Sequence, residues 1–356
     1  MAKTEFSRTI TEFAPGDGLF ERLAMLTTRY RPNVEAEQAE PSYYDYPVLQ
    51  QPFWHWEIIW YFFFGGLAAG TYIIASIASL FGSREDRVVA RTGYYLSLLA
   101  LLPCPPLLIK DLGRPERFLN MLRIIKVKSP MSMGSWALFT FSLFSGAVAV
   151  IQAARDGILG KWWGAKLLAA LPQKLIALPG MGVAAFLGGY TGVLLVVTSV
   201  PLWSRSKLLG AIFITSAMST GSALISLVLR LVGAPAHTLH KLERVEWMAM
   251  LVEMTGLLAF LRTSGRAARP LVGNGPEEHG ATFWRFMFGG GLALPWLLQS
   301  LLLLLGRRSG KPASMGGGLL ISLLVLVGGY FLRHTMIHAG HTSSKDARTT
   351  LWNAKR

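Results

Sequence analysis

The amino-acid sequence predicts an all-α fold, a polytopic membrane helical bundle with eight transmembrane helices. Of its 356 residues, 52% are hydrophobic and 15% are charged, whereas about a quarter of a soluble domain is usually charged. From His55 onward there are eight apolar runs, each close to the ~20 residues that a helix needs to cross a bilayer. Backbone polar groups in lipid must be paired within their own segment, so these runs are predicted to be helices.

Three of the first four predicted spans contain prolines or glycine clusters that predict local features. In the second span, Pro103, Pro105 and Pro106 remove backbone donors, which predicts a kink or an unwound turn just before Lys110. Glycine clusters in the first and fourth spans, at 65–70 and 188–192, allow close helix contact, and packing is their simplest explanation. These four spans are expected at 56–81, 88–109, 131–153 and 179–202.

The last four predicted spans carry ionisable groups within apolar sequence. Arg230 lies in the fifth, Glu246 and Glu253 lie in the sixth, and Arg333 lies in the eighth. Such groups are costly in a membrane unless they are paired or hydrated. The four spans are expected at 208–232, 243–262, 282–305 and 315–338, with a further glycine cluster at 289–291 in the seventh.

The segments outside the spans divide the chain into three parts. Residues 1–50 are polar and form an N-terminal extension that is expected to contact a partner or to be partly disordered. Residues 51–341 form the membrane domain, and residues 342–356 form a basic C-terminal tail. An even number of spans places both ends of the chain on one side of the membrane. Fifteen Lys and Arg on that side against twelve on the other leave the orientation open.

The connection between the second and third spans is the most informative segment. It begins at Lys110 and reads DLGRPERFLNMLRIIKVKSPMSMGSW over residues 111–136. Residues 114–126 are predicted to form a short helix in the membrane interface, with Phe118 and Leu122 toward lipid and Arg117 outward. So many charges at a membrane surface are more than a simple connector needs.

This segment resembles the signature region of the NrfD/PsrC family, the integral membrane subunits of polysulfide reductase and related respiratory complexes. The resemblance covers residues 50–341 and is specific to the family but not to one complex. It extends to four further motifs, Phe53-Trp54-His55-Trp56, Gly189-Tyr190-Thr191-Gly192, Pro201-Leu202-Trp203 and Gly328-Gly329-Tyr330-Phe331-Leu332-Arg333.

The resemblance implies a quinone-interacting subunit that is not catalytically complete alone. It would exchange electrons between menaquinone or ubiquinone, as an exchangeable ligand, and a ferredoxin-like iron–sulfur subunit. That partner would connect to a molybdopterin-type or other catalytic subunit. The docking loop would include Arg114, Glu116, Arg117, Arg123 and Lys126. Family members of this kind lie in the inner membrane, and their docking face is often extracytoplasmic.

The residue types agree with an electron carrier that comes from outside the chain. The single cysteine, Cys104, cannot supply the ligands of an iron–sulfur cluster or a thiolate metal site. Only His334 and His338 of the seven histidines lie within a predicted span, and both are on the eighth. No haem, flavin, cluster or other metal is therefore expected in this chain. The distribution of basic residues in loops also argues against nucleic acid as a partner.

The family resemblance also transfers roles to individual residues. Asp111 would exchange a proton with the quinone, with Arg114 or Lys110 holding its charge, and Tyr190 would hydrogen-bond a carbonyl oxygen. Some members place His and Asn in the first span where this chain has Tyr61 and Ile58, so the third polar partner is either Tyr61 or His55.

Each of these residues also has a simpler explanation. Asp111 could be a surface acid neutralised by its basic neighbours, and Tyr190 could form a hydrogen bond between helices. His55 could belong to an interfacial aromatic belt, because it lies between two tryptophans.

The ionisable groups in the membrane are candidates for a proton relay. Arg230 and Glu246 lie at similar distances from the hairpin between the fifth and sixth spans, so an ion pair would explain them without a relay. Glu253 has no obvious partner in the sequence, and Arg333 of the eighth span is a further candidate. A proton or solute transporter therefore remains an alternative function, although we find no internal repeat of the loop at 110–136. A passive membrane anchor for peripheral subunits is the other alternative.

Overall fold

The structure is a computed structural model that describes residues 49–309 and 315–354, and in these residues it contains helices and no strands. The N-terminal extension expected at 1–50 lies outside the described residues except for its last two. The all-α fold is confirmed. The long helices are α3 (Trp56–Phe81), α4 (Arg87–Leu101), α7 (Pro130–Arg155), α9 (Gln173–Val196), α11 (Leu209–Leu231), α12 (Ala236–Ser264), α14 (Leu294–Ser309) and α15 (Met315–Lys345).

Short helices connect and extend these elements. The π-helix η5 precedes α14 and forms one span with it, because together they run without a break from residue 282. The short elements are α5 (Cys104–Asp111), η3 (Pro115–Arg117), α6 (Phe118–Arg123), α8 (Trp163–Ala170), α10 (Pro201–Ser204), η4 (Gly265–Ala268), α13 (Arg269–Val272), η5 (Thr282–Ala293) and α16 (Ala347–Ala354).

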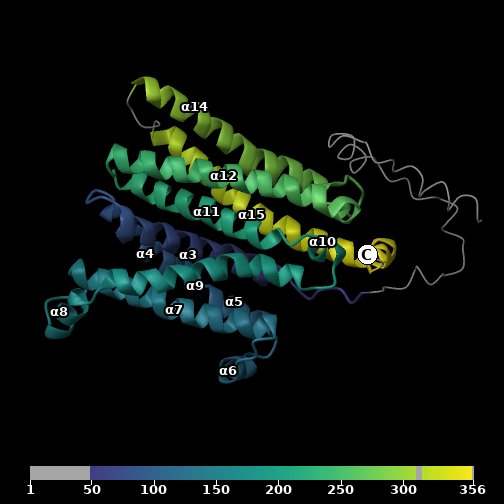
Figure 1. Cartoon of the computed structure of the whole chain (residues 1–356), viewed down its shortest axis with the longest axis horizontal. Helices are drawn as coiled ribbons and strands as arrows, with labels where there is room; N and C mark the ends of the chain where they lie inside the picture. The colour runs from purple at the N-terminus through teal and green to yellow at the C-terminus, as the bar shows by residue number, and fades with distance from the viewer. Residues whose placement is uncertain (1–48, 310–314, 355–356) are drawn as a thin grey trace, which may run out of the picture.

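The long helices lie side by side in a single elongated bundle (Figure 1). Helices α6 and α10 and the C-terminal end of the protein lie at one end of the bundle, which we call the α6 end, and α8 lies at the other, the α8 end. Helix α3 is central: 83% of its apolar window is buried inside the protein, against 28% for the η5–α14 span. The more exposed helices are those expected to face lipid.

Seven of the described helical segments are long and apolar enough to cross a membrane. The eighth predicted span, α12, has sufficient length with 29 residues and runs alongside α11 (Figure 1). It carries Glu243, Arg244, Glu246 and Glu253, so its composition does not qualify it as a span. The polytopic bundle is therefore confirmed, while the count of eight spans stays a prediction.

The interruption in the second span lies earlier than the sequence predicts. Helix α4 ends at Leu101 and α5 begins at Cys104, whereas the sequence predicts a kink just before Lys110. A proline removes the hydrogen bond to the carbonyl four residues before it, so the ladder is broken on the N-terminal side of the three prolines. Within the first turn of α5 the missing donors cost nothing, because amide groups there have no partner inside the helix.

The fourth span is displaced toward the N-terminus relative to the predicted 179–202. Helix α9 begins at Gln173 and contains Pro179, and it ends at Val196 before an extended Val200. The residue before a proline disfavours the helical conformation, so Pro201 ends one helix and starts the next, α10. The early start is explained by polar contacts of Gln173.

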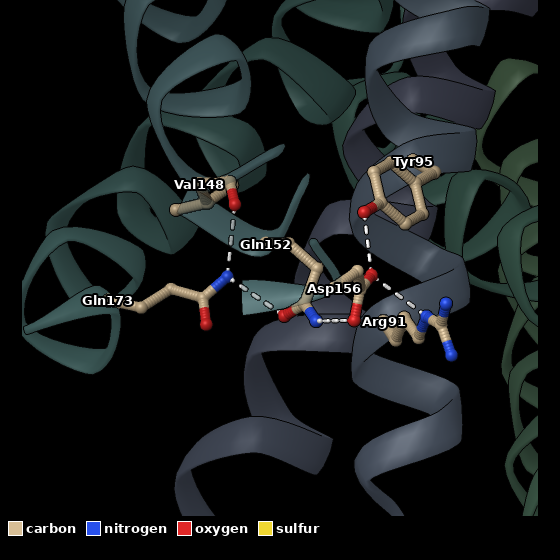
Figure 2. Close-up of polar contacts among 6 residues, drawn as sticks. All are labelled: Arg91, Tyr95, Val148, Gln152, Asp156 and Gln173. Atoms are coloured by element: carbon tan, nitrogen blue, oxygen red, sulfur yellow. Dashed lines mark hydrogen bonds and ion pairs between the residues drawn. The ribbon is translucent and has the colours of Figure 1, made fainter. Parts of the chain in front are cut away.

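These polar contacts brace three helices at the α8 end (Figure 2). Gln173 donates from Nε2 to the Val148 carbonyl at 3.0 Å and to Gln152 Oε1 at 3.3 Å. Gln152 in turn donates to Asp156 at 3.1 Å. Asp156, which directly follows α7, also accepts hydrogen bonds from Arg91 Nε at 2.8 Å and from the Tyr95 hydroxyl at 2.7 Å, both on α4. Helices α4, α7 and α9 are thereby held in register far from the α6 end.

The connection between the second and third spans contains the helix expected there, but a shorter one. The sequence predicts a helix over 114–126, and the structure has η3 over Pro115–Arg117 followed by α6 over Phe118–Arg123. After Arg123 the backbone turns extended at Ile124. Exposed apolar side chains on this segment suit a membrane interface or a partner surface. They are Leu119, Ile124, Ile125 and Val127.

Candidate functional site

The head of α3 and the end of α5 meet at the α6 end of the bundle. Lys110 Nζ lies 3.4 Å from Glu57 Oε1 and 4.1 Å from the centre of the Trp56 ring. Asp111 is half-buried at the last position of α5 and interacts electrostatically with Glu57 and His55. The structure thus brings together two of the predicted quinone-site residues, Asp111 and His55, in a charged cluster.

Tyr190 lies deeper in the bundle, on α9. Its hydroxyl donates a hydrogen bond to the Pro130 carbonyl at the start of α7, and its ring stacks on Phe186 with 5.6 Å between centroids. A Cβ atom on Gly134 would lie 2.5 Å from this hydroxyl, so the glycine makes room for it. The tyrosine therefore joins two helices, which is the simpler of its two predicted roles, and its oxygen can still accept a hydrogen bond.

Tyr61 lies near Tyr190 but is covered by protein. Only 3% of Tyr61 is exposed, and it interacts electrostatically with Tyr190 and Cys104. The predicted quinone residues therefore form two groups, a buried pair of tyrosines and a more accessible cluster around Asp111 and His55. Neither Asp111 nor Tyr190 lines one of the two hollows described next.

The first hollow belongs to the predicted docking loop. It has a volume of about 510 Å³, and Arg114 and Arg117 contribute to its wall together with Leu112, Gly113 and Met121. The predicted docking residues are all exposed around it: Arg114, Glu116, Arg117, Arg123 and Lys126. We call the basic side chains of this loop, Lys110, Arg114, Arg117, Arg123, Lys126 and Lys128, the cationic ledge.

The second hollow lies between the head of α3 and the end of α15 and has a volume of about 320 Å³. Its lining residues are Trp54, His55, Trp56, Glu57, His338 and His341. Sequence reasoning proposed His55 for the site but overlooked His338 and His341. Their spacing was a usable signal, because His334, His338 and His341 occupy positions i, i+4 and i+7 and share one face of a helix.

The acids of α12 form a buried row with a different pairing from the expected one. Arg230 on α11 forms its salt bridge with Glu243, and His240 Nδ1 lies 3.1 Å from the other carboxylate oxygen of Glu243. The expected partner, Glu246, lies one turn further and is buried, and within the described residues its Oε1 has no hydrogen-bond partner. Glu243 precedes Glu246 by three residues, so both face α11, and the earlier one reaches the guanidinium.

Glu253 and Arg333 are connected through two serines of α11. Ser219 donates to Glu253 Oε2 at 2.7 Å, while Arg333 Nη1 donates to Ser216 Oγ at 2.6 Å and to the Gly329 carbonyl at 2.8 Å. All four side chains are buried. The proton-relay candidates therefore fall into two polar groups, one around Glu243 and one around Glu253, and these two positions lie about 15 Å apart along α12 for ten helical residues.

No group of three or more His, Cys, Asp or Glu side chains in the described part of the protein could hold a metal ion. The histidines at the end of α15 thus are not arranged as a metal centre. Their chemistry is that of hydrogen-bonding and proton-exchanging groups.

The fold and this end of the bundle define a class of protein: a multi-pass α-helical membrane protein with an exposed cationic surface beside a half-buried acid and a histidine-lined hollow. Residues 47–343 match the family described as "Polysulphide reductase, NrfD". The chain belongs to this family and is a membrane subunit of the respiratory oxidoreductase type.

Individual relatives agree with this assignment over most of their length. The C subunit of polysulfide reductase from Wolinella succinogenes is 27% identical over 307 residues, which cover 81% of this protein and 94% of the relative. Protein NrfD of Escherichia coli is 27% identical over 305 residues, covering 77% and 92% respectively. The NrfD homolog of Haemophilus influenzae is 25% identical over 321 residues, covering 83% and 98%.

Proposed function

We propose that this protein exchanges electrons between the membrane quinone pool and an iron–sulfur partner subunit that docks on the cationic ledge. The observation that carries the proposal is the position of the half-buried Asp111 at the end of α5, where it interacts with His55 and lies between Lys110 and Arg114 of the ledge. A proton-exchanging group and a docking surface are then adjacent. Electron exchange with quinone requires the first because a quinone gains or loses protons together with electrons, and it requires the second because the electrons come from or go to the partner subunit.

The composition of the protein supports a division of labour between subunits. One cysteine supplies too few thiolates for an iron–sulfur cluster. The relatives are the membrane subunits of polysulfide reductase and NrfD systems, so peripheral subunits are expected to carry the redox centres. The ledge presents six basic side chains, and opposite charge on a partner would orient it on this end of the bundle.

The experiment measures quinol-driven reduction of the iron–sulfur partner in the purified complex. Asp111→Asn removes the proton-exchanging carboxylate while keeping its size, so the rate is expected to fall by about 10²-fold or more. Assembly, followed by co-purification of the subunits, is expected to be unchanged. Glu85→Gln, in the turn between the end of α3 and the start of α4, is the matched control and is expected to keep the full rate, because Glu85 is exposed and lies at the opposite end of α3 from His55. An unchanged rate in Asp111→Asn together with normal assembly would favour a passive anchor.

A further inference from the structure

The hollow between α3 and α15 has walls suited to a flat ring. Trp54 stacks on the buried Trp203, with 5.2 Å between ring centroids and 21° between planes. Trp203 is itself fixed, because its Nε1 donates to the Met336 carbonyl at 2.9 Å. Trp56 forms another wall and is held under Lys110. The volume of about 320 Å³ lies at the lower end of the range for small-molecule sites.

One buried polar atom of the hollow lacks a partner that would explain it. His341 Nε2 is buried, and within the described residues it has no hydrogen-bond partner. An unpaired buried polar atom is costly, so a ligand or water that pairs with it is stabilised at this position. His55, Glu57 and His338 add further groups that can donate or accept at the rim. A ring with oxygen atoms at its edge matches this combination.

A row of histidines leads from the hollow toward water. The His338 ring lies 6.1 Å from His341 and 5.8 Å from His279, measured between centroids. His279 Nε2 lies 3.4 Å from the Thr342 hydroxyl, which donates to the carbonyl of the exposed Glu277 at 3.0 Å. Burial and the neighbouring His338 hold the pKa of His279 below its ordinary value, so this ring is neutral at neutral pH and can accept a proton.

An aromatic track leads from the same hollow into the membrane region. His334 lies 4.3 Å from His338 and 6.0 Å from Tyr330, between ring centroids. Tyr330 contacts Trp60 at 4.7 Å and Phe63 at 6.0 Å, so half-buried rings of α3 and α15 continue the path. A long apolar tail attached to the ring would lie along this track.

We propose that the hollow between α3 and α15 receives the quinone ring, with His341 as the group that hydrogen-bonds it and with His338 and His279 as the route of its proton to water. This inference rests on the proposed function. Each quinone that is reduced gains two electrons, which the reduced iron–sulfur partner supplies, and two protons from water. One proton arrives through the histidine row from the Glu277 surface, and the other arrives through Asp111, which interacts electrostatically with His55 and Glu57 of the hollow. Oxidation of the quinol reverses both transfers.

The charges around this row decide how it responds to pH. Several charged or titratable groups lie around His341 and His338. They are His55 directly before α3, Glu57 on α3, Lys110 on α5, Glu277 and His279 ahead of η5, and His334 and Lys345 on α15. Lys110 and Lys345 are paired with Glu57 and Glu277, at 3.4 and 3.0 Å. The histidines therefore are the groups of this set that can both accept and donate a proton.

The first experiment locates the ring without relying on turnover. A photoreactive azidoquinone is added to the full membrane complex, and labelled peptides are identified by mass spectrometry with and without excess unlabelled quinone. We expect competed labelling within residues 54–57 and 338–341. Competed labelling confined to the peptides of Asp111 and Tyr190 would overturn this inference and leave the proposed function in place. The absence of any competed labelling would overturn both.

The second experiment tests the role of the histidines. His341→Gln keeps a hydrogen-bonding side chain without a titratable ring, and His341→Leu removes both properties. We expect His341→Leu to lose labelling by at least about tenfold and His341→Gln to keep it. For quinol oxidation by His341→Gln and His338→Gln we expect a lower kcat, an unchanged KM and a flattened pH profile between about pH 5 and 8. His237→Gln, at the exposed α8 end, is the control that should keep the wild-type profile. Wild-type pH profiles in both glutamine variants would contradict the proton route.

Discussion

Two of the three buried acids of α12 are stabilised by different neighbours, and the third has an unpaired oxygen among the described residues. Glu243 is neutralised by Arg230, and Glu253 receives the hydroxyl of Ser219. Glu246 lies between them with one carboxylate oxygen unpaired among the described residues. An isolated ionised carboxylate in such surroundings would be very costly. A carboxylic acid that can gain and lose a proton at this depth is a natural member of a relay.

The Glu253→Gln variant tests whether this residue is part of a relay. The amide keeps an oxygen that accepts from Ser219, so folding should be preserved, but it cannot exchange a proton. We expect quinone-linked proton transfer to slow by about tenfold or more and its pH response to change. Ser219→Ala is the complementary control, since it removes the hydrogen bond that Glu253→Gln keeps and leaves the titratable group in place. Quinone turnover and pH response that match the wild type in Glu253→Gln would remove this residue from any relay. Both quantities can be measured on proteoliposomes with an internal pH dye.

Individual residues show where sequence reasoning reached its limit. The chemistry of Glu253 and Arg333 could be anticipated, because a charge within an apolar run always requires a partner. Their connection through Ser216 and Ser219 could not, because serines within helices usually bond to their own backbone. Likewise, the pairing of Arg230 with Glu243 in preference to Glu246 depends on the relative rotation of α11 and α12, which periodicity alone does not fix.

At the scale of elements, α12 is the helix whose apolar character is weakest and whose position depends most on polar contacts. Its Lys241 lies 2.7 Å from Asp86 in the turn between α3 and α4. Asp86 also accepts hydrogen bonds from the amide and hydroxyl of Ser83, at 2.8 and 2.9 Å. Burial opposes ionisation of Asp86, but the bonds from Lys241 and Ser83 outweigh it and hold the pKa of this carboxyl below its usual value.

A lowered pKa makes the contribution of this contact depend on pH in a defined direction. The stabilisation is complete above 3.8, the ordinary value for an aspartate, and is lost as the pH falls through the lower value of the folded protein. We expect Asp86→Asn to cost about 1 kcal/mol at pH 7, because Lys241 is partly exposed and solvent screens the pair. Thermal unfolding in detergent should show this difference and its disappearance below pH 3.8. Glu85→Gln, one residue earlier and exposed, should behave as wild type, and an equal loss in both variants would contradict the assignment.

Elements could be predicted from the sequence wherever apolar length defined them. The helices at 56–81, 208–232 and 315–338 reproduce this rule, although α15 continues to Lys345. The start of α9 could not be found in this way, because Gln173 and its polar contacts, not apolar length, set it. The interruption after Leu101 was expected in kind but misplaced by about two turns, since a proline acts on the carbonyl of the preceding turn.

At the scale of the whole molecule, the two ends of the bundle have different tasks. At the α8 end, one hydrogen-bond network around Asp156 connects Arg91, Tyr95, Gln152 and Gln173 (Figure 2). The α6 end has both hollows, the cationic ledge and the histidine row. Rigidity at one end and accessible polar groups at the other fit a protein that binds its partners at a single face.

This asymmetry predicts which charge changes disrupt assembly. Reversing three ledge charges, as Arg114→Glu, Arg117→Glu and Lys126→Glu together, should weaken docking of the iron–sulfur partner by about tenfold or more and reduce the salt dependence of its binding. The matched control reverses Lys161 and Lys166, which are exposed near α8 at the opposite end, and should leave docking unchanged. Binding of the purified partner to the membrane subunit in nanodiscs, measured over a range of salt concentrations, distinguishes the two sets. If the control weakened binding and the ledge variant did not, the partner would dock at the α8 end, and the proton-exchanging groups would then lie at the wrong side of the membrane for the proposed electron exchange.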